Sequence, residues 1–161
     1  MSSSIRPLIQ AELPGLRAIR HDLHAHPELS FDEKRTSGVV QRELAALNIA
    51  FKAGLGGGTG VLGYLPASTP EGNKLKSVAL RADMDALPIT EETGKAYASC
   101  NPGVMHACGH DGHTAMLIGA ARILSKAQRP QPVTFVFQPA EEGGGGANLM
   151  CKEGCLCGEI S

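Results

Sequence analysis

The segment that most constrains the fold is VTFVFQPAEE at residues 133–142, a nearly continuous apolar run that ends in a proline and two carboxylates. A strand that is apolar on both sides is usually covered on both, as in an α/β sheet with helices above and below. The chain has 161 residues, 42% of them apolar, which suits one domain with a real core and is too short for two. We therefore expect the α/β class, with an open, mostly parallel sheet and helices on both faces.

The periodicity of apolar residues predicts the other elements. One helix is expected to end near His26. A second is expected to begin at Ser30 and Glu33, whose Ser-x-x-Glu spacing matches a capping box. The further expected elements are a helix over residues 114–127 and strands within VLGYL (61–65) and SVALRADMDALPI (77–89). These two strands would be joined as a hairpin or by a crossover.

The stretch MHACGHDGH, residues 105–113, concentrates three of the six histidines of the chain beside a cysteine. It falls between a predicted strand and a predicted helix, so we expect an extended loop. On an extended backbone the side chains of His106, Cys108 and His110 fall on one side, and Cys108 and His110 could reach one ion. Thiolate and imidazole suit zinc, and they tolerate manganese, cobalt or nickel when carboxylates complete the shell. A lone histidine is more often an ordinary polar residue, but the cluster favours a metal site.

Two pairs of acidic residues follow predicted strands. Glu141 and Glu142 are adjacent at a strand end, where open α/β sheets form their crevices, and adjacent carboxylates repel unless a cation lies beside them. One of them could bind the ion while the other accepts a proton from water. Asp83 and Asp85 share one side of a strand and could face the same crevice, although a turn capped by aspartate explains them equally well.

Composition excludes several classes of partner. The formal net charge is −1, so the chain offers no basic surface for nucleic acid or anionic lipid. No apolar run approaches the roughly 20 residues needed to span a bilayer, and the N-terminus lacks the pattern of a signal peptide. We therefore expect no nucleic-acid or membrane partner and a cytoplasmic location.

Five cysteines with no framework spacing favour thiols over disulfides. Near the end of the sequence, Cys151, Cys155 and Cys157 could form a small thiolate site. Small buried residues at a helix end are the more common explanation of such a pattern.

Four segments, in this order and at similar intervals, resemble the N-terminal part of a known enzyme family: HDLHAHPELSFDE, LRADMDALPI, MHACGHDGHTAML and FQPAEEGGGGA. They are similar to the metal-dependent amidohydrolases that include hippurate hydrolase, N-acyl-amino-acid hydrolases (aminoacylases) and the plant indole-acetyl-amino-acid hydrolases. The resemblance extends from about residue 21 to residue 147. It implies the N-terminal portion of a dinuclear metallopeptidase catalytic domain, which hydrolyses the amide bond of small N-acylated amino acids with two divalent ions per complete site.

The resemblance also assigns roles to residues. It implies that Cys108, His110 and Glu142 are metal ligands and that Glu141 is the general base. Asp85 matches an aspartate that orients a ligand from behind the metal. Zinc or manganese would activate the water, Glu141 would take its proton, and the protonated Glu141 would pass that proton to the leaving amine.

The remaining histidines receive lesser roles. His106 and His113 are candidates for outer hydrogen-bond partners of the ligands or for helix caps. His24 and His26 are expected to be structural.

Members of this family continue beyond the segments matched here, with further ligand histidines and a second domain that covers the site. Neither is found in this sequence, so we expect residues 1–161 to be a partial catalytic α/β domain without its lid or dimerisation domain. Such a chain would be a fragment, a truncated reading frame or a splice form, impaired in turnover. Complete members often oligomerise, and the fragment is expected to self-associate through an exposed apolar sheet edge.

Three functions remain open at this point. The first is the metal-dependent amidohydrolase, and the second is a non-catalytic metal-binding or interaction fragment of one. The third is a nucleotide-binding enzyme that uses GLGGGTG, residues 54–60. That stretch precedes a strand and lacks the strand-loop-helix context of a phosphate-binding loop, which disfavours the third function.

Overall fold

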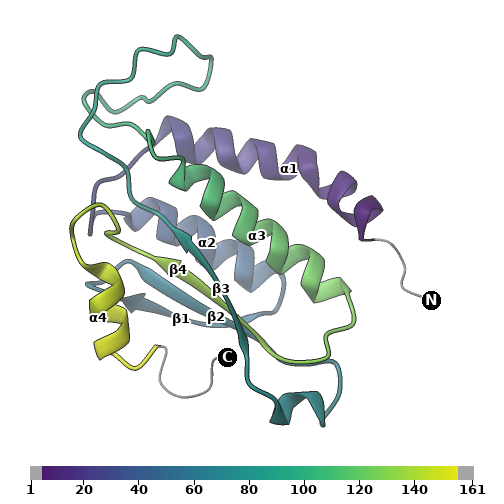
Figure 1. Cartoon of the computed structure of the whole chain (residues 1–161). Helices are drawn as coiled ribbons and strands as arrows, with labels where there is room; N and C mark the ends of the chain where they lie inside the picture. Colours follow the sequence, from purple (N-terminus) through teal and green to yellow (C-terminus); the bar gives the residue numbers. More distant parts are fainter. Residues whose placement is uncertain (1–4, 156–161) are drawn as a thin grey trace.

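The computed structural model describes residues 5–155, which form one sheet with helices packed on it (Figure 1). The strand order in the sheet is β1-β2-β4-β3. The strands are β1 (Ala50–Leu55), β2 (Gly60–Leu65), β3 (Val78–Asp83) and β4 (Val133–Gln138). The helices are α1 (Arg6–Ala25), α2 (Lys34–Ala46), α3 (His110–Lys126), α4 (Gly146–Lys152) and the short 3-10 helix Gly72–Lys74. No helix within residues 5–155 is long and apolar enough to cross a bilayer.

The α/β class is confirmed, but the strand directions differ from the prediction. Only β3 and β4 pair in parallel, whereas β1 with β2 and β2 with β4 pair antiparallel. The expectation of a mostly parallel sheet is therefore wrong for these four strands. Strand β1 was not predicted, and only a short turn separates it from β2. So short a connection can join only antiparallel strands, which accounts for the pairing of β1 with β2.

The GLGGGTG stretch forms this hairpin connection. It runs from the end of β1 into β2, with positive φ at Gly56, Gly57 and Gly58, and no helix follows it. This arrangement removes the structural basis for a phosphate-binding loop. The strands within residues 61–65 and 77–89 are both present but are not neighbours, because β4 lies between β2 and β3.

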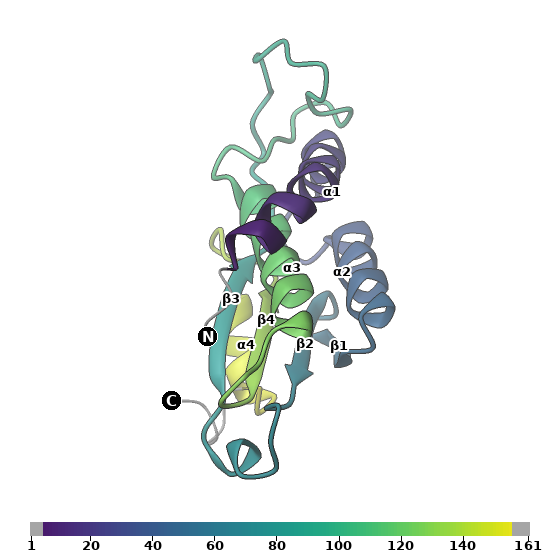
Figure 2. The same ribbon diagram turned by 90° about the vertical axis from the view of Figure 1, so that its right-hand side faces the viewer.

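Helices cover both faces of the sheet, as predicted, because the apolar side chains of β4 alternate between two clusters. Phe135 and Phe137 point into the main core with residues of α1, α2 and α3, which stack along one side of the sheet in Figure 2. Val136 belongs to a smaller cluster with Met150 of α4 and Cys155. The continuously apolar sequence of β4 thus reflects burial on both faces, and all six of its residues are buried.

Two predicted helix starts need correction. The third helix begins at His110, four residues earlier than expected, after Gly109 in a left-handed conformation (φ 83°). The second begins at Lys34, and its N-cap residue Glu33 makes no side-chain capping hydrogen bond, so the predicted capping box is wrong. The side chains of Ser30 and Glu33 instead bind groups at the strand ends, as described below. The first helix ends at Ala25, as expected.

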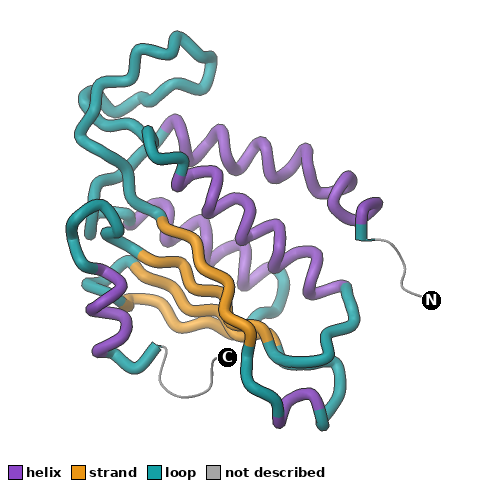
Figure 3. The backbone as a smooth tube through the Cα atoms, in the orientation of Figure 1, coloured by secondary structure: helices purple, strands orange, loops and turns teal. Residues whose placement is uncertain are grey.

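Residues 84–109 form a long connection between β3 and α3 that projects beyond the sheet (Figure 3). It carries the predicted metal-binding stretch at its end. Cys151 and Cys155 belong to the C-terminal segment, where Cys151 is exposed and Cys155 is buried. The third member of that predicted thiolate site, Cys157, lies outside the described residues.

Candidate metal centre

The candidate site lies where the parallel strands β3 and β4 end. Their carboxyl ends meet at the same edge of the sheet, which is where open α/β sheets form ligand crevices. Asp85 follows β3, and Glu141 with Glu142 follows β4. His110 enters from the first turn of α3, at the edge that the sequence predicted.

His110 is the residue around which the site is arranged. It is buried, with 5% of its surface exposed. Its Nδ1 donates to the backbone carbonyl of Asp85 at 2.9 Å and lies 3.2 Å from the carboxylate Oδ1 of the same residue. Its Nε2 faces two carboxylates, 3.9 Å from Glu141 Oε2 and 3.9 Å from Glu142 Oε1. The hydrogen bond with Asp85 raises the pKa of His110 above its ordinary value, against the opposing effect of burial.

The side chain of Asp85 contacts three other residues of the site. Its carboxylate is buried and accepts hydrogen bonds from Ser30 Oγ at 2.9 Å and from the backbone N–H of Glu142 at 2.9 Å, besides the contact with His110. Burial alone would raise its pKa, but these donors outweigh it and lower the pKa to about 2. Asp85 therefore stays ionised and ties β3, α3 and the turn after β4 to one point.

Glu141 and Glu142 converge on His110. Their side chains are 41% and 22% exposed, and the ligand atoms of His110, Glu141 and Glu142 all lie within 4.8 Å of one another. An imidazole nitrogen and two carboxylates directed at one point are a donor set that suits zinc or manganese. Because like charges this close repel, a divalent cation would relieve the repulsion, and the residues present fit such an ion.

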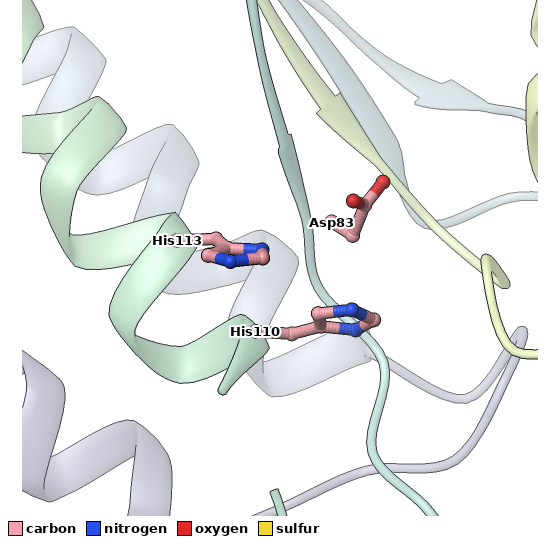
Figure 4. Close-up of side chains that lie close together, drawn as sticks. All are labelled: Asp83, His110 and His113. Carbon is pink, nitrogen blue, oxygen red and sulfur yellow. The ribbon is translucent and has the colours of Figure 1, made fainter. Parts of the chain in front are cut away.

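A second group shares His110. The ligand atoms of Asp83, His110 and His113 also lie within 4.8 Å of one another, and Figure 4 shows both imidazoles projecting from α3 toward the end of β3. The His113 ring is 5.3 Å from that of His110, and His113 is exposed. Asp83 has a competing partner, because its Oδ1 lies 2.7 Å from an Arg81 guanidinium nitrogen. Asp83 thus lies at the site, and the exposed His113 lies on the solvent side of His110 rather than behind it.

Cys108 lies at the border of the site. It is exposed, and the interaction of its thiol with the neighbouring Glu142 carboxylate raises the pKa of the thiol above its ordinary value. Within residues 5–155 it belongs to neither group of converging ligand atoms. The prediction that the side chains of Cys108 and His110 extend from one strand-like backbone is wrong, because His110 already belongs to α3.

The rings of His106, in the long loop before α3, and of His24, in α1, lie 6.5 Å apart. Burial lowers the pKa of His106 to about 4, and neither ring nitrogen has a hydrogen-bond partner within the part of the chain that the structure describes. His24 bridges Asp111 at 2.7 Å and Glu91 at 3.2 Å, a structural role of the kind expected for it. His26 donates from Nδ1 to the carbonyl of Asp22 at 2.8 Å within α1 and its cap.

Sequence reasoning missed three residues whose hydrogen bonds support the site. Ser30 donates to Asp85, and Glu33 accepts hydrogen bonds from Thr59 Oγ1 at 2.6 Å and from the backbone N–H of Ala140 at 2.8 Å. The only signal for Ser30 and Glu33 was their place in HDLHAHPELSFDE, where their spacing was attributed to a helix cap. Thr59 gave no signal apart from the glycine-rich stretch around it.

Comparison with known proteins identifies relatives of this chain. A hydrolase of Staphylococcus aureus (strain bovine RF122 / ET3-1) is 47% identical over 149 residues, which are 90% of this chain and 37% of that protein. A Rhodococcus jostii (strain RHA1) protein named as a glutamate–cysteine ligase is 51% identical over 140 residues, 86% of this chain and 17% of that protein. The chain therefore spans well under half of these relatives.

A crystal structure shares the fold. The Bacillus subtilis YXEP protein, described as a dinuclear metal binding peptidase from M20 family, superposes with a TM-score of 0.86 at 40% identity. The match covers 94% of this chain and 42% of that one. The family model for peptidase family M20/M25/M40 matches residues 79–160, which include β3 from its second residue, the histidine-rich stretch, α3, β4 and both glutamates. The chain belongs to peptidase family M20/M25/M40.

Proposed function

We propose that this chain supplies the metal-binding and proton-transferring residues of a hydrolase that cleaves the amide bond of small N-acylated amino acids. The observation that carries the proposal is the orientation of His110. Its Nδ1 donates a hydrogen bond to the backbone carbonyl of Asp85, and its Nε2 faces Glu141 and Glu142. Histidines that bind metals commonly donate from one ring nitrogen to a carbonyl or carboxylate, which leaves the other nitrogen for the ion.

Cys108, His110 and Glu142 would hold a divalent ion, zinc or manganese, in this proposal. When bound, such an ion lowers the pKa of water from about 15.7 towards 7 and polarises a carbonyl group. Cobalt and nickel fit the same nitrogen, oxygen and sulfur donors. Asp83 and His113 add donors on the open side of His110 and are available to a second ion.

Glu141 is the proposed general base. Its side chain is the more exposed of the two glutamates, at 41% against 22% for Glu142. A carboxylate that is reachable from solvent can accept a proton from water and deliver it to the departing amine. The more buried Glu142 is better suited to a fixed ligand.

The proposal assigns residues 1–161 to part of a catalytic domain. The chain spans 42% of the Bacillus subtilis peptidase, which supports the view that an active enzyme needs residues beyond those described here. A small N-acyl amino acid is the proposed substrate. A thiol ligand suits a reducing compartment, so we place the protein in the cytoplasm as part of the proposal.

A chimera tests this function. In it, residues 1–161 replace the matching part of the Bacillus subtilis peptidase, and hydrolysis of N-acetyl and N-benzoyl amino acids is measured with added Mn²⁺ or Zn²⁺. The chimera should bind metal and turn over substrate, and its Glu141→Gln variant should keep the metal but lose turnover, because glutamine cannot accept the proton. Metal binding without turnover would favour a non-catalytic metal-binding fragment. Full activity with glutamine at position 141 would refute the assigned base.

A further inference from the structure

The turn that carries Glu141 and Glu142 has an uncommon backbone conformation. Ala140, directly before the pair, has φ 49° and is one of three non-glycine residues with positive φ in the described part of the chain. Side chains disfavour this region, so it persists only where the surroundings determine it. Ala140 is fully buried, and its carbonyl accepts a hydrogen bond from the backbone N–H of Gly146 at 3.1 Å.

Glu33 contacts this turn from the start of α2. Its side chain has no exposed surface, and it does not cap α2 although it stands at the N-cap. One carboxylate oxygen accepts the N–H of Ala140 at 2.8 Å, and the other accepts the hydroxyl of Thr59 at 2.6 Å. Thr59 is itself 3% exposed and ends the glycine-rich hairpin. The carboxylate therefore joins the start of α2, the β1–β2 hairpin and the turn after β4.

The two glutamates are thus held from both ends. Upstream, Glu33 holds the N–H of Ala140, and downstream, Asp85 holds the N–H of Glu142 at 2.9 Å. Glu33 does not contact His110, Glu141 or Glu142 by any hydrogen bond within residues 5–155. Its effect on the site must pass through the backbone of the turn.

We propose that Glu33, anchored by Thr59, is a positioning residue that sets the direction of the Glu141–Glu142 pair toward His110. The inference rests on the proposed function, because it concerns how the same pair receives a metal. It also gives a role to the glycine-rich hairpin, whose conformation brings the Thr59 hydroxyl to Glu33. Outer contacts of this kind tune metal affinity by orienting the ligands.

The test compares three variants of the chain. Glu33→Ala removes both acceptors. Glu33→Gln keeps the shape, can accept the Ala140 N–H and can donate to the Thr59 hydroxyl. Thr134→Val is the matched control. Thr134 lies on β4 at the end away from the site, and the substitution breaks its buried hydroxyl pair with Ser77 (2.7 Å).

Two measurements are made on each variant. The first is affinity for Zn²⁺ by competition with a chromophoric chelator, at a temperature where circular dichroism shows the variant folded. The second is amide hydrogen exchange of Glu142 by NMR without metal, which reports the turn at a residue that Glu33 does not touch. Glu33→Ala should weaken Zn²⁺ binding roughly 10- to 100-fold and lose protection at Glu142, while Glu33→Gln and Thr134→Val should retain both.

Equal affinity and equal Glu142 protection in folded Glu33→Ala would overturn the inference, as would an equal loss in Thr134→Val. If Glu33→Ala does not fold, Thr59→Val decides, because it removes only the hydroxyl and should give a smaller loss of both. No Zn²⁺ binding by the unaltered chain would contradict the proposed function, whereas the exchange of the Glu142 amide would still decide the role of Glu33.

Discussion

The Nδ1 atom of His110 lies 2.9 Å from the backbone carbonyl oxygen of Asp85. A carbonyl can only accept, so Nδ1 carries the proton and the neutral ring has its lone pair on Nε2, facing the two glutamates. The main chain of Asp85 thereby fixes the tautomer, and its carboxylate fixes the ring through a second contact at 3.2 Å. A single residue after β3 therefore sets the tautomer and the orientation of the imidazole that we propose as a metal ligand.

Asp85→Asn should weaken metal binding although the residue contacts no metal in the proposed arrangement. Both carboxylate oxygens accept hydrogen bonds, and the amide nitrogen of asparagine cannot accept one, so either His110 or the Ser30 and Glu142 donors lose their partner. We expect a loss of roughly 10- to 100-fold in Zn²⁺ affinity, measured by calorimetry. Asp32→Asn, at an exposed carboxylate, serves as the control. Unchanged affinity in Asp85→Asn would remove Asp85 from the site.

Cys108→Ala should lower metal content with little effect on folding. The thiol is exposed, so its removal leaves no core cavity, whereas a thiolate ligand contributes both charge and softness to a zinc site. Cys100→Ala is a matched control, because Cys100 is also an exposed thiol and lies in the loop away from the converging groups. Plasma mass spectrometry of the purified proteins gives the metal content. Equal content in both variants would exclude Cys108 as a ligand.

Strand β4 and the position of Glu141 and Glu142 could be predicted because burial on both faces leaves a direct mark on the sequence. All six residues of β4 are buried, and the proline after the strand marks its end. Strand β1 was missed for the opposite reason. Its residues AFKAGL are mostly exposed at a sheet edge and include Lys52 and Gly54, so neither alternation nor an apolar run distinguishes them from a loop.

The inner support of the site could not be predicted because it depends on contacts between distant segments. Ser30 and Glu33 have the spacing of a helix cap, and only the folded chain brings Asp85 and Ala140 within reach of them. Similarly, α3 begins at His110 after a left-handed glycine without a side-chain cap, and no local signal marks such a start. Local patterns identified residues that face the crevice but not those that hold them.

The chain should self-associate through the open edge of β3. Within the described residues β3 pairs only with β4, and its Ala79 and Leu80 pack partly exposed on the two faces of the sheet. The backbone N–H groups of Val78 and Met84 donate toward β4, so the N–H of Ala79, which alternates with them, points away from β4. Ala79→Pro would therefore remove a donor at the open edge without breaking the hydrogen bonds between β3 and β4. Sedimentation should show concentration-dependent association that this variant reduces, at equal stability in urea. A monomer at all concentrations would contradict the prediction.

Glu91 should make the stability of the long loop sensitive to acid. Its side chain is 2% exposed and accepts hydrogen bonds from Thr93, from the backbone N–H of Ser99 at 2.6 Å and from His24 at 3.2 Å. Burial alone would raise its pKa, but these donors lower it from 4.5 to about 2. Above pH 4.5 the carboxylate is ionised in both the folded and the unfolded chain, and its stabilisation is complete.

As the pH falls from 4.5 towards 2, the unfolded chain takes up a proton that the folded chain does not, so the stabilisation from Glu91 is progressively lost. Glu91→Gln lacks this ionisation and leaves a buried donor poorly paired, so we expect it to lower the free energy of unfolding by about 1–3 kcal/mol at neutral pH. The difference between the two proteins should stay constant above about pH 5 and shrink in more acidic solution. Urea titrations of the unaltered chain and of Glu91→Gln at several pH values measure it, with the neighbouring exposed Glu92→Gln as the control. A difference that does not change between pH 7 and pH 3 would show that the Glu91 carboxylate is not held in its ionised form by the fold.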